Sequence, residues 1–313
     1  MPVDTDIFIF TEIVNCGLIG RIAFQTFHKF HNRKLHIYGR TEDFLQIEFH
    51  PNNIYHFLDQ DQDIVDSFQF GHRGTSKIWT KAILEAKEKY LIHIDSDVVF
   101  RGDAVEEVIQ KLGEYDIVGS MRNYPNNPHK HRNDVRHLPD VTATYCFGFN
   151  KDLIKVDQPH LLARLVENSL DNFVVAELRY RYPWYQYVPT IDYFDPVAFI
   201  IIQHGGKVHI VDNNVLGGFD NEGGKKNKYG ILNEDCDFGD KIIHFASVGS
   251  GLNFLQKIQK QQPIQVDKWY VEYALSKLDL YLRLFYNQNI LSDGESKFLQ
   301  NIETLRQNLQ GII

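Results

Sequence analysis

The feature that most constrains the fold is a short apolar run, YLIHI, at residues 90–94. Near-continuous runs of this kind are typical of strands inside a parallel sheet, because helices cover both faces of such sheets. Residues 75–89, directly before this run, have a helix-like pattern. Its apolar face consists of Ile78, Trp79, Ala82, Ile83 and Ala86. The two segments together predict an α/β fold, in which ligands bind outside the carboxyl ends of the strands.

The same alternation of strand and helix patterns continues along the chain. Further strand-like segments lie at residues 6–14, 34–40, 54–59, 115–120 and 241–247. Residues 142–154 have the pattern of a strand that turns into a helix, and residues 195–211 that of a helix, a Gly-Gly stop and a strand. From residue 265 on the pattern is helical. We therefore expect one domain over residues 1–255 and a helical extension, packed on it, over residues 256–313.

Composition narrows the classes of partner and compartment. The chain has 313 residues, and its 43% hydrophobic content is enough for a sizeable core. A formal net charge of −8 argues against a nucleic-acid surface, since phosphate backbones are bound by basic faces. Three widely spaced cysteines without a CxxC pair indicate neither a disulfide framework nor a zinc site. No leader pattern or apolar run of about 18 residues is present, so a cytoplasmic protein without a transmembrane segment is expected.

Two aspartates, Asp95 and Asp97, follow directly at the carboxyl end of the apolar run. Two ionised carboxylates about 5 Å apart repel each other by roughly 3 kcal/mol at an effective dielectric constant of about 20. A site that keeps both ionised at a buried strand end therefore favours a cation, and a hard divalent metal fits that need. The simpler alternative is that the two residues only end the strand and begin a turn.

The arrangement resembles the DxD motif of glycosyltransferases of the GT-A fold. That resemblance implies a Rossmann-like, mixed but mostly parallel central sheet, and a nucleoside-diphosphate sugar bound through a divalent metal. It places Asp95 at the ribose and the metal, and Asp97 on the metal. His244, near the end of the catalytic domain, is the implied third metal ligand, and Gly249 and Gly251 let the backbone approach phosphate. Mn²⁺ suits one nitrogen among oxygen ligands, with Mg²⁺ as the alternative.

The resemblance also implies where the donor, expected to be UDP-linked, would bind. In such enzymes the end of the first strand, the residue after the second strand, the loop before the DxD helix and the DxD itself reach the nucleotide. The corresponding residues here are Thr11, Glu12, Arg40, His72, Arg73, Lys77 and Ser96. Those in the loop at residues 70–77 are equally well explained as solvated turn residues at a helix start.

The expected acceptor is a hydroxyl of a glycan or glycoconjugate, with the tyrosine-rich stretch at residues 179–194 as its wall. An inverting transfer needs a carboxylate base. Asp195 is the first candidate and Asp192 the second. The alternative for Asp195 is an ordinary helix N-cap, since Pro196 follows it. The segment after His244 lacks the lysine and tryptophan of glycogenin-like retaining enzymes, and no EDxxL-type signature is obvious, so the stereochemistry stays open.

Other interpretations of the same residues stay open. Haloacid-dehalogenase-like phosphatases also end an apolar strand in DxD, with the first aspartate as nucleophile, but place it near the N-terminus. Nucleotide-sugar pyrophosphorylases share a similar sheet, and a non-catalytic carbohydrate-binding protein could use the tyrosine-rich stretch. The C-terminal apolar stripe between Trp269 and Phe285 packs on its own domain, or else docks on a membrane surface or forms a homodimer.

Overall fold

The computed structural model describes the strands and helices of the first half of the chain and a few later elements. The described residues are 6–13, 17–45, 47–67, 72–121, 142–155, 162, 195–211, 241–244 and 307. They form a seven-stranded sheet in the order β3-β2-β1-β4-β7-β6-β8 and a two-stranded sheet of β5 and β9. No helix among these residues is both long and apolar enough to cross a membrane.

The large sheet is mixed and mostly parallel, as predicted. Its strands are β1 (Ile7–Ile13), β2 (Leu35–Gly39), β3 (Asn53–Phe57), β4 (Tyr90–Ile94), β6 (Ile117–Met121), β7 (Thr142–Asn150) and β8 (Val208–Ile210). Strand β1 pairs in parallel with β2 on one side and with β4 on the other, and β6 pairs in parallel with β8. Strand β7 runs antiparallel to both of its neighbours, β4 and β6. The predicted burial of residues 90–94 is confirmed, because every residue of β4 is buried.

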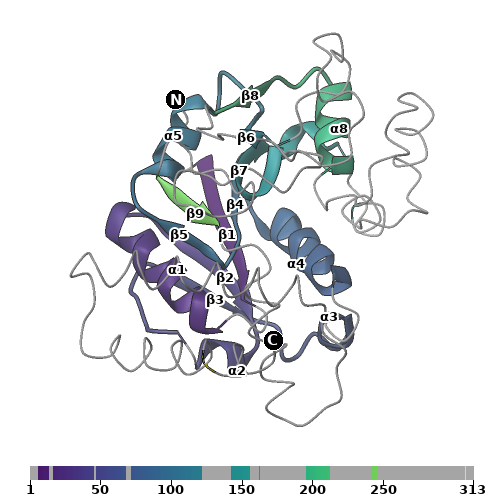
Figure 1. The fold of residues 1–313 in the computed structure, drawn as a ribbon. Helices are drawn as coiled ribbons and strands as arrows, with labels where there is room; N and C mark the ends of the chain where they lie inside the picture. Colours follow the sequence, from purple (N-terminus) through teal and green to yellow (C-terminus); the bar gives the residue numbers. More distant parts are fainter. Residues whose placement is uncertain are drawn as a thin grey trace.

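Helices cover both faces of this sheet (Figure 1). The helices are α1 (Gly17–Phe30), α2 (Thr41–Phe44), α3 (Gln62–Ser67), α4 (His72–Glu85), α5 (Ala104–Lys111) and α8 (Asp195–Gln203). Apolar residues of α1 and α5 form one core with every second residue of β1 and β4, beginning at Ile9 and Tyr90. Residues of α4 and α8 form a second core with the alternate residues, Phe8, Phe10 and Leu91. The period of two in the strands thus assigns each strand residue to one core or the other.

The start of α4 differs from the sequence prediction, whereas the end of α8 matches it. Helix α4 begins at His72, three residues before the predicted start at residue 75, so His72, Arg73 and Lys77 are helical and not part of a loop. The expected Gly-Gly stop after α8 is confirmed. Gly205 has a φ of 87°, and the amides of Gly205 and Gly206 bond back to the carbonyls of Ile202 and Ile201 at 2.9 Å each.

The small sheet joins two segments that are far apart in the sequence. Strand β5 (Val98–Phe100) follows the two aspartates directly, and it pairs antiparallel with β9 (Ile242–His244). In this register the Cα of Val98 is the partner of the Cα of His244. The predicted extension at residues 256–313 lies outside the described residues apart from Gln307, so the division into two regions stays a prediction.

Candidate active site

The carboxyl ends of β1 and β4 form the point where the strand order reverses. From β1 the chain builds β2 and β3 toward one edge of the sheet, whereas β4 pairs on the opposite side of β1. Ligands of open α/β sheets bind in the crevice at such a switch point. Glu12 lies near the end of β1, and Asp95 follows the last residue of β4. Both carboxylates therefore lie where the topology itself favours a ligand.

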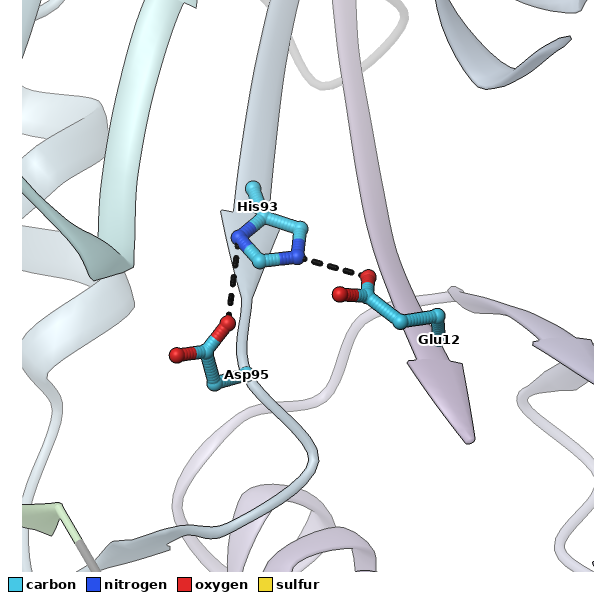
Figure 2. Close-up of side chains that lie close together, drawn as sticks. All are labelled: Glu12, His93 and Asp95. Carbon is cyan, nitrogen blue, oxygen red and sulfur yellow. Dashed lines mark hydrogen bonds and ion pairs between the residues drawn. The ribbon is translucent and has the colours of Figure 1, made fainter. Parts of the chain in front are cut away.

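A buried histidine lies between these two carboxylates (Figure 2). His93 Nε2 is 2.8 Å from Glu12 Oε2, a hydrogen-bond distance. On the other side of the ring, His93 Nδ1 is 3.7 Å from Asp95 Oδ1, which is close but longer than a hydrogen bond. The side chain of His93 has no exposed surface, that of Glu12 is 13% exposed and that of Asp95 is 27% exposed. Access to the group therefore increases from His93 through Glu12 to Asp95.

Aromatic rings hold the imidazole of His93 in place. The centroid of its ring is 4.2 Å from Trp79 on α4, 5.0 Å from Phe10 on β1 and 5.9 Å from Phe147 on β7. Strand alternation puts Leu91, His93 and Asp95 on one face of β4, the face that α4 covers. The ring is thus fixed by packing from three elements, and its nitrogens face Glu12 and Asp95 (Figure 2).

The sequence prediction did not include His93 among the site residues. Its position was within reach of the same argument that singled out Asp95, because residues two apart in a strand share a face. The apolar character of the YLIHI run concealed it, since a histidine within such a run is equally compatible with a satisfied core residue.

Asp97 lies in the turn between β4 and β5 and is partly exposed. Strand β5, which follows Asp97, is anchored on helix α1. The Phe100 N–H donates to Thr26 Oγ1 of α1 at 3.0 Å, and Phe27 of α1 packs edge-on against the Phe100 ring. The pairing of Val98 with His244 brings the backbone of the predicted third ligand beside Asp97. Residues directly opposite each other in an antiparallel pair have Cα atoms about 4.5–5.5 Å apart.

The donor atoms at this edge fit a hard or borderline divalent cation. Within the described residues, Glu12, His93 and Asp95 form the one group of three ligating side chains whose ligand atoms all lie within 4.8 Å of one another. The two nitrogens of His93 face different carboxylates, however, and Nε2 is already at hydrogen-bond distance from Glu12. The predicted ligand set of Asp95, Asp97 and His244 stays a prediction, because for His244 the structure describes the backbone alone.

Cys146 is excluded as a soft ligand or nucleophile at this edge. It lies opposite Ile94, next to the aspartates, and is completely buried. Burial raises the pKa of its thiol well above its usual range, and the negative charge of Asp95 raises it further. The thiol therefore stays protonated, and only a thiolate would bind metal or attack a substrate.

Of the predicted nucleotide-binding residues at the strand ends, Glu12 is partly exposed, whereas Thr11 and Ser96 are buried. Thr11 and Glu12 are neighbours in β1 and so point to opposite faces. Glu12 is on the His93 side, whereas Thr11 is completely buried and its Oγ1 has no hydrogen-bond partner among the described residues. Ser96, between the two aspartates, is buried as well.

Two predicted nucleotide-binding cations are engaged elsewhere. Arg40 bonds to the buried carboxylate of Asp43 through Nε at 2.8 Å and Nη2 at 3.1 Å. Burial alone would lower the pKa of the Arg40 guanidinium, but the bonds to Asp43 outweigh it and raise the pKa. Lys77 Nζ lies 2.7 Å from Asp63 Oδ2 and ties α4 to α3. Neither side chain needs a nucleotide to account for its position.

The remaining predictions fall wholly or partly outside the described residues. Asp192, Gly249 and Gly251 lie outside them. For His72, Arg73, Asp195 and His244 the structure describes the backbone alone. Asp195 is the first residue of α8, as expected for either a helix cap or a base at a helix start. Their roles stay predictions.

No family model and no curated protein matches this chain. Solved structures do resemble it. Mouse xyloside xylosyltransferase 1 in its apo form is 14% identical, over 66% of this chain and 85% of that one, with a TM-score of 0.41. The galactosyltransferase LgtC, in complex with donor and acceptor sugar analogs, is 11% identical over 66% and 73%, with a TM-score of 0.41. The mannosyltransferase PcManGT from Pyrobaculum calidifontis, in complex with GDP-Man and Mn²⁺, is 10% identical over 97% and 87%, with a TM-score of 0.42. At such values the functional argument rests on the residues of the site.

Proposed function

We propose that this protein is a metal-dependent glycosyltransferase that moves a sugar from a nucleoside-diphosphate donor, expected to be UDP-linked, to a hydroxyl of a glycan or glycoconjugate. One observation carries the proposal: Glu12 and Asp95 converge at the topological switch point, and the β5–β9 pairing adds His244 beside Asp97. Acidic side chains from separate segments gather at the edge where an α/β sheet binds ligands. An anionic ligand there requires a cation between it and the acids.

The residues of the chain divide the work in this proposal. Asp95, Asp97 and His244 would hold Mn²⁺ or Mg²⁺, which when bound neutralises charge on the diphosphate. Glu12, at the end of β1, accepts a hydrogen bond from the donor's nucleoside. Gly249 and Gly251 give the phosphates access to backbone amides. Thr11 and Ser96 are too buried to contribute more than their backbone groups.

The reaction breaks the bond between the anomeric carbon and the diphosphate oxygen, and the electron pair leaves with the diphosphate. A new bond forms between that carbon and the acceptor oxygen, whose proton passes to a carboxylate. Asp195 is our first choice for this base and Asp192 our second, since a base must lie within about 3 Å of the proton it takes. The division into a catalytic domain at residues 1–255 and a packed extension at 256–313 belongs to the same proposal.

A thermal-shift panel of UDP-, GDP- and TDP-sugars, each with and without Mn²⁺, tests the proposal. A donor at 100 times its dissociation constant stabilises the folded state by about 2.7 kcal/mol. We expect one donor class to stabilise the protein, and only with the metal. Stabilisation by none of them would overturn the proposal, and Mg²⁺-dependent hydrolysis of p-nitrophenyl phosphate in its place would assign the phosphatase reaction.

A further inference from the structure

We propose that His93 is a positioning residue that holds Glu12 and Asp95 in one arrangement, so that nucleoside binding at β1 and cation binding at β4 occur together. The inference rests on the proposed function and adds a residue that touches neither substrate nor metal. It starts from the position of the ring: His93 faces one carboxylate with each nitrogen, Glu12 at 2.8 Å and Asp95 at 3.7 Å. Glu12 lies in β1, and Asp95 directly follows β4 (Figure 2).

Strand register explains why this residue can make both contacts. Phe10 of β1 is the parallel partner of His93 in β4. Glu12 lies two residues after Phe10 and Asp95 two residues after His93. Each carboxylate is therefore on the same face of the sheet as Phe10 and His93. An imidazole at this position lies between the two strands, two residues before Asp95 and beside Glu12, so it can reach both carboxylates. A shorter or an apolar side chain in the same place would pack but would lose the hydrogen bond to Glu12 and the nitrogen that faces Asp95.

The surroundings of His93 restrict it to one orientation. Trp79, Phe10 and Phe147 enclose the ring with centroid separations between 4.2 and 5.9 Å. The ring therefore cannot turn away from Glu12 without disturbing three elements of the core. Because Glu12 is only 13% exposed, water can replace the imidazole N–H poorly. The bond thus sets the direction of the Glu12 carboxylate, and outer groups of this kind typically alter ligand or metal affinity by about 10- to 100-fold.

Two variants of His93 and one control variant separate packing from positioning. His93→Phe keeps an aromatic ring among its aromatic neighbours and removes both nitrogens. His93→Gln places an amide N–H near the position of Nε2 and so retains a donor for Glu12. His31→Phe is the matched control, because His31 is also a buried histidine against aromatic rings, on α1's side of the sheet.

Calorimetric titration with UDP, GDP and TDP in the presence of Mn²⁺ gives the dissociation constant for each variant. We expect His93→Phe to raise the dissociation constant about 10- to 100-fold, His93→Gln to recover most of that loss, and His31→Phe to leave the constant unchanged. In a double-mutant cycle, Glu12→Gln and His93→Phe together should weaken binding less than the product of their separate effects. Tyr38→Phe is the control for this cycle, because the Tyr38 hydroxyl donates to Glu85 and not to Glu12. The effects of Glu12→Gln and Tyr38→Phe on the dissociation constant should simply multiply.

The outcomes separate the two proposals. If the wild-type protein binds none of the three nucleotides with Mn²⁺, the proposed function is wrong. If the wild-type protein binds one of them and a folded His93→Phe variant binds it equally well, or if the cycle shows no coupling, the proposed function stands and His93 is only a core residue. Should His93→Phe fail to fold, His93→Leu, which also removes both nitrogens, takes its place in the cycle: coupling to Glu12→Gln supports the positioning role, and its absence overturns it.

Discussion

Two buried histidines on opposite faces of the sheet show how differently the same residue type can be used. His93, on the face covered by α4, is enclosed by aromatic rings and directs a nitrogen at each of two carboxylates. His31, directly after α1 on the other face, is 1% exposed and packs against Phe27 and Phe100 with ring centroids about 5 Å away. Neither of its nitrogens has a hydrogen-bond partner within the described ranges, and Glu106 Oε1 is 4.0 Å away.

Burial and aromatic contact are therefore common to both residues and do not distinguish a site residue from a packing residue. The groups that face the nitrogens do. Burial lowers the pKa of His31 to about 4, although Glu106 and Asp103 act in the opposite direction. His31 is thus neutral near pH 7 and serves as a core ring. We use His93 and its carboxylates as the site region, and His31 with α1, β5 and α5 as the packing region.

The largest expected effect contrasts one aspartate from each region. Asp95→Asn should lower turnover by at least about 10²-fold, because it removes a fixed charge from the reacting site. It should also remove the Mn²⁺-dependent part of nucleotide stabilisation, as chelation of the metal from the wild-type protein should. Asp97→Asn should do the same. Initial rates with the donor identified by thermal shift, with and without EDTA, measure the effect.

Asp103→Asn is the control from the packing region. Asp103 forms an ion pair with Lys241 at 2.9 Å, and its side chain is more than half exposed. Exposed pairs contribute about 0–1 kcal/mol, so turnover and metal dependence should stay near wild type. Equal losses from Asp95→Asn and Asp103→Asn would abolish the distinction between the two regions.

The second prediction concerns the pH dependence of stability in the packing region. His31 has a folded-state pKa of about 4 against 6.5 for the free side chain. Between those values the unfolded chain binds a proton that the folded chain does not, so the free energy of unfolding falls as pH drops from 6.5 toward 4. His28 and His36, whose pKa values are likewise lowered to about 4 by burial, act in the same direction.

His31→Phe should make this acid-induced loss smaller by about 1–3 kcal/mol, since one pH unit corresponds to at most about 1.4 kcal/mol per group. Urea unfolding of each protein at pH 7.5 and at pH 4.5 measures it, and the difference between the two pH values cancels any packing change. A variant that loses as much stability as the wild type would show that His31 is not buried as a neutral ring.

The fold was largely accessible from the sequence, because patterns of period two and 3.6 report burial directly. The run at residues 90–94 and the stop at Gly205 were both confirmed. The antiparallel direction of β7 was not accessible, since the segment at residues 142–150 has a strand pattern that fits either direction. The pairing of β5 with β9 could not be derived either, because it joins segments far apart in the chain.

The candidate site was only partly accessible for a related reason. Asp95 stood out because a charge after an apolar run needs a cause, whereas His93 inside the run did not. Arg40 and Lys77 were chosen by charge and position, and the structure pairs them with Asp43 and Asp63. The sequence shows which groups are present near a strand end but not which of them are already bonded to one another.

The third prediction tests the bond that anchors β5 on α1, within the packing region. Thr26→Val keeps the shape of the side chain and removes the acceptor of the buried Phe100 N–H. An unsatisfied buried donor costs about 1–3 kcal/mol, so the free energy of unfolding in urea should fall by that amount. Thr26→Ser should restore most of it. Nucleotide affinity should change far less than in His93→Phe, and an equal change would mean that the packing region controls the site.

The smallest expected effect lies at Lys77, which the sequence predicted as a nucleotide contact and the structure places in an ion pair. The pair with Asp63 is exposed on the aspartate side, so its loss should cost only about 0–1 kcal/mol of stability. If Lys77 only ties α4 to α3, both variants, Lys77→Gln and Asp63→Asn, should leave the nucleotide dissociation constant unchanged. Lys77→Gln should lower the stability slightly more than Asp63→Asn, because it also removes the bond to the backbone carbonyl of Asp63 at 3.0 Å. If Lys77 also reaches phosphate, Lys77→Gln should weaken Mn²⁺–nucleotide binding, whereas Asp63→Asn, which removes only the ion pair and keeps the lysine, should not weaken it. Calorimetric titration of both variants therefore decides whether the site region extends onto the first turns of α4, and a loss of affinity confined to Lys77→Gln would place Lys77 in the site region.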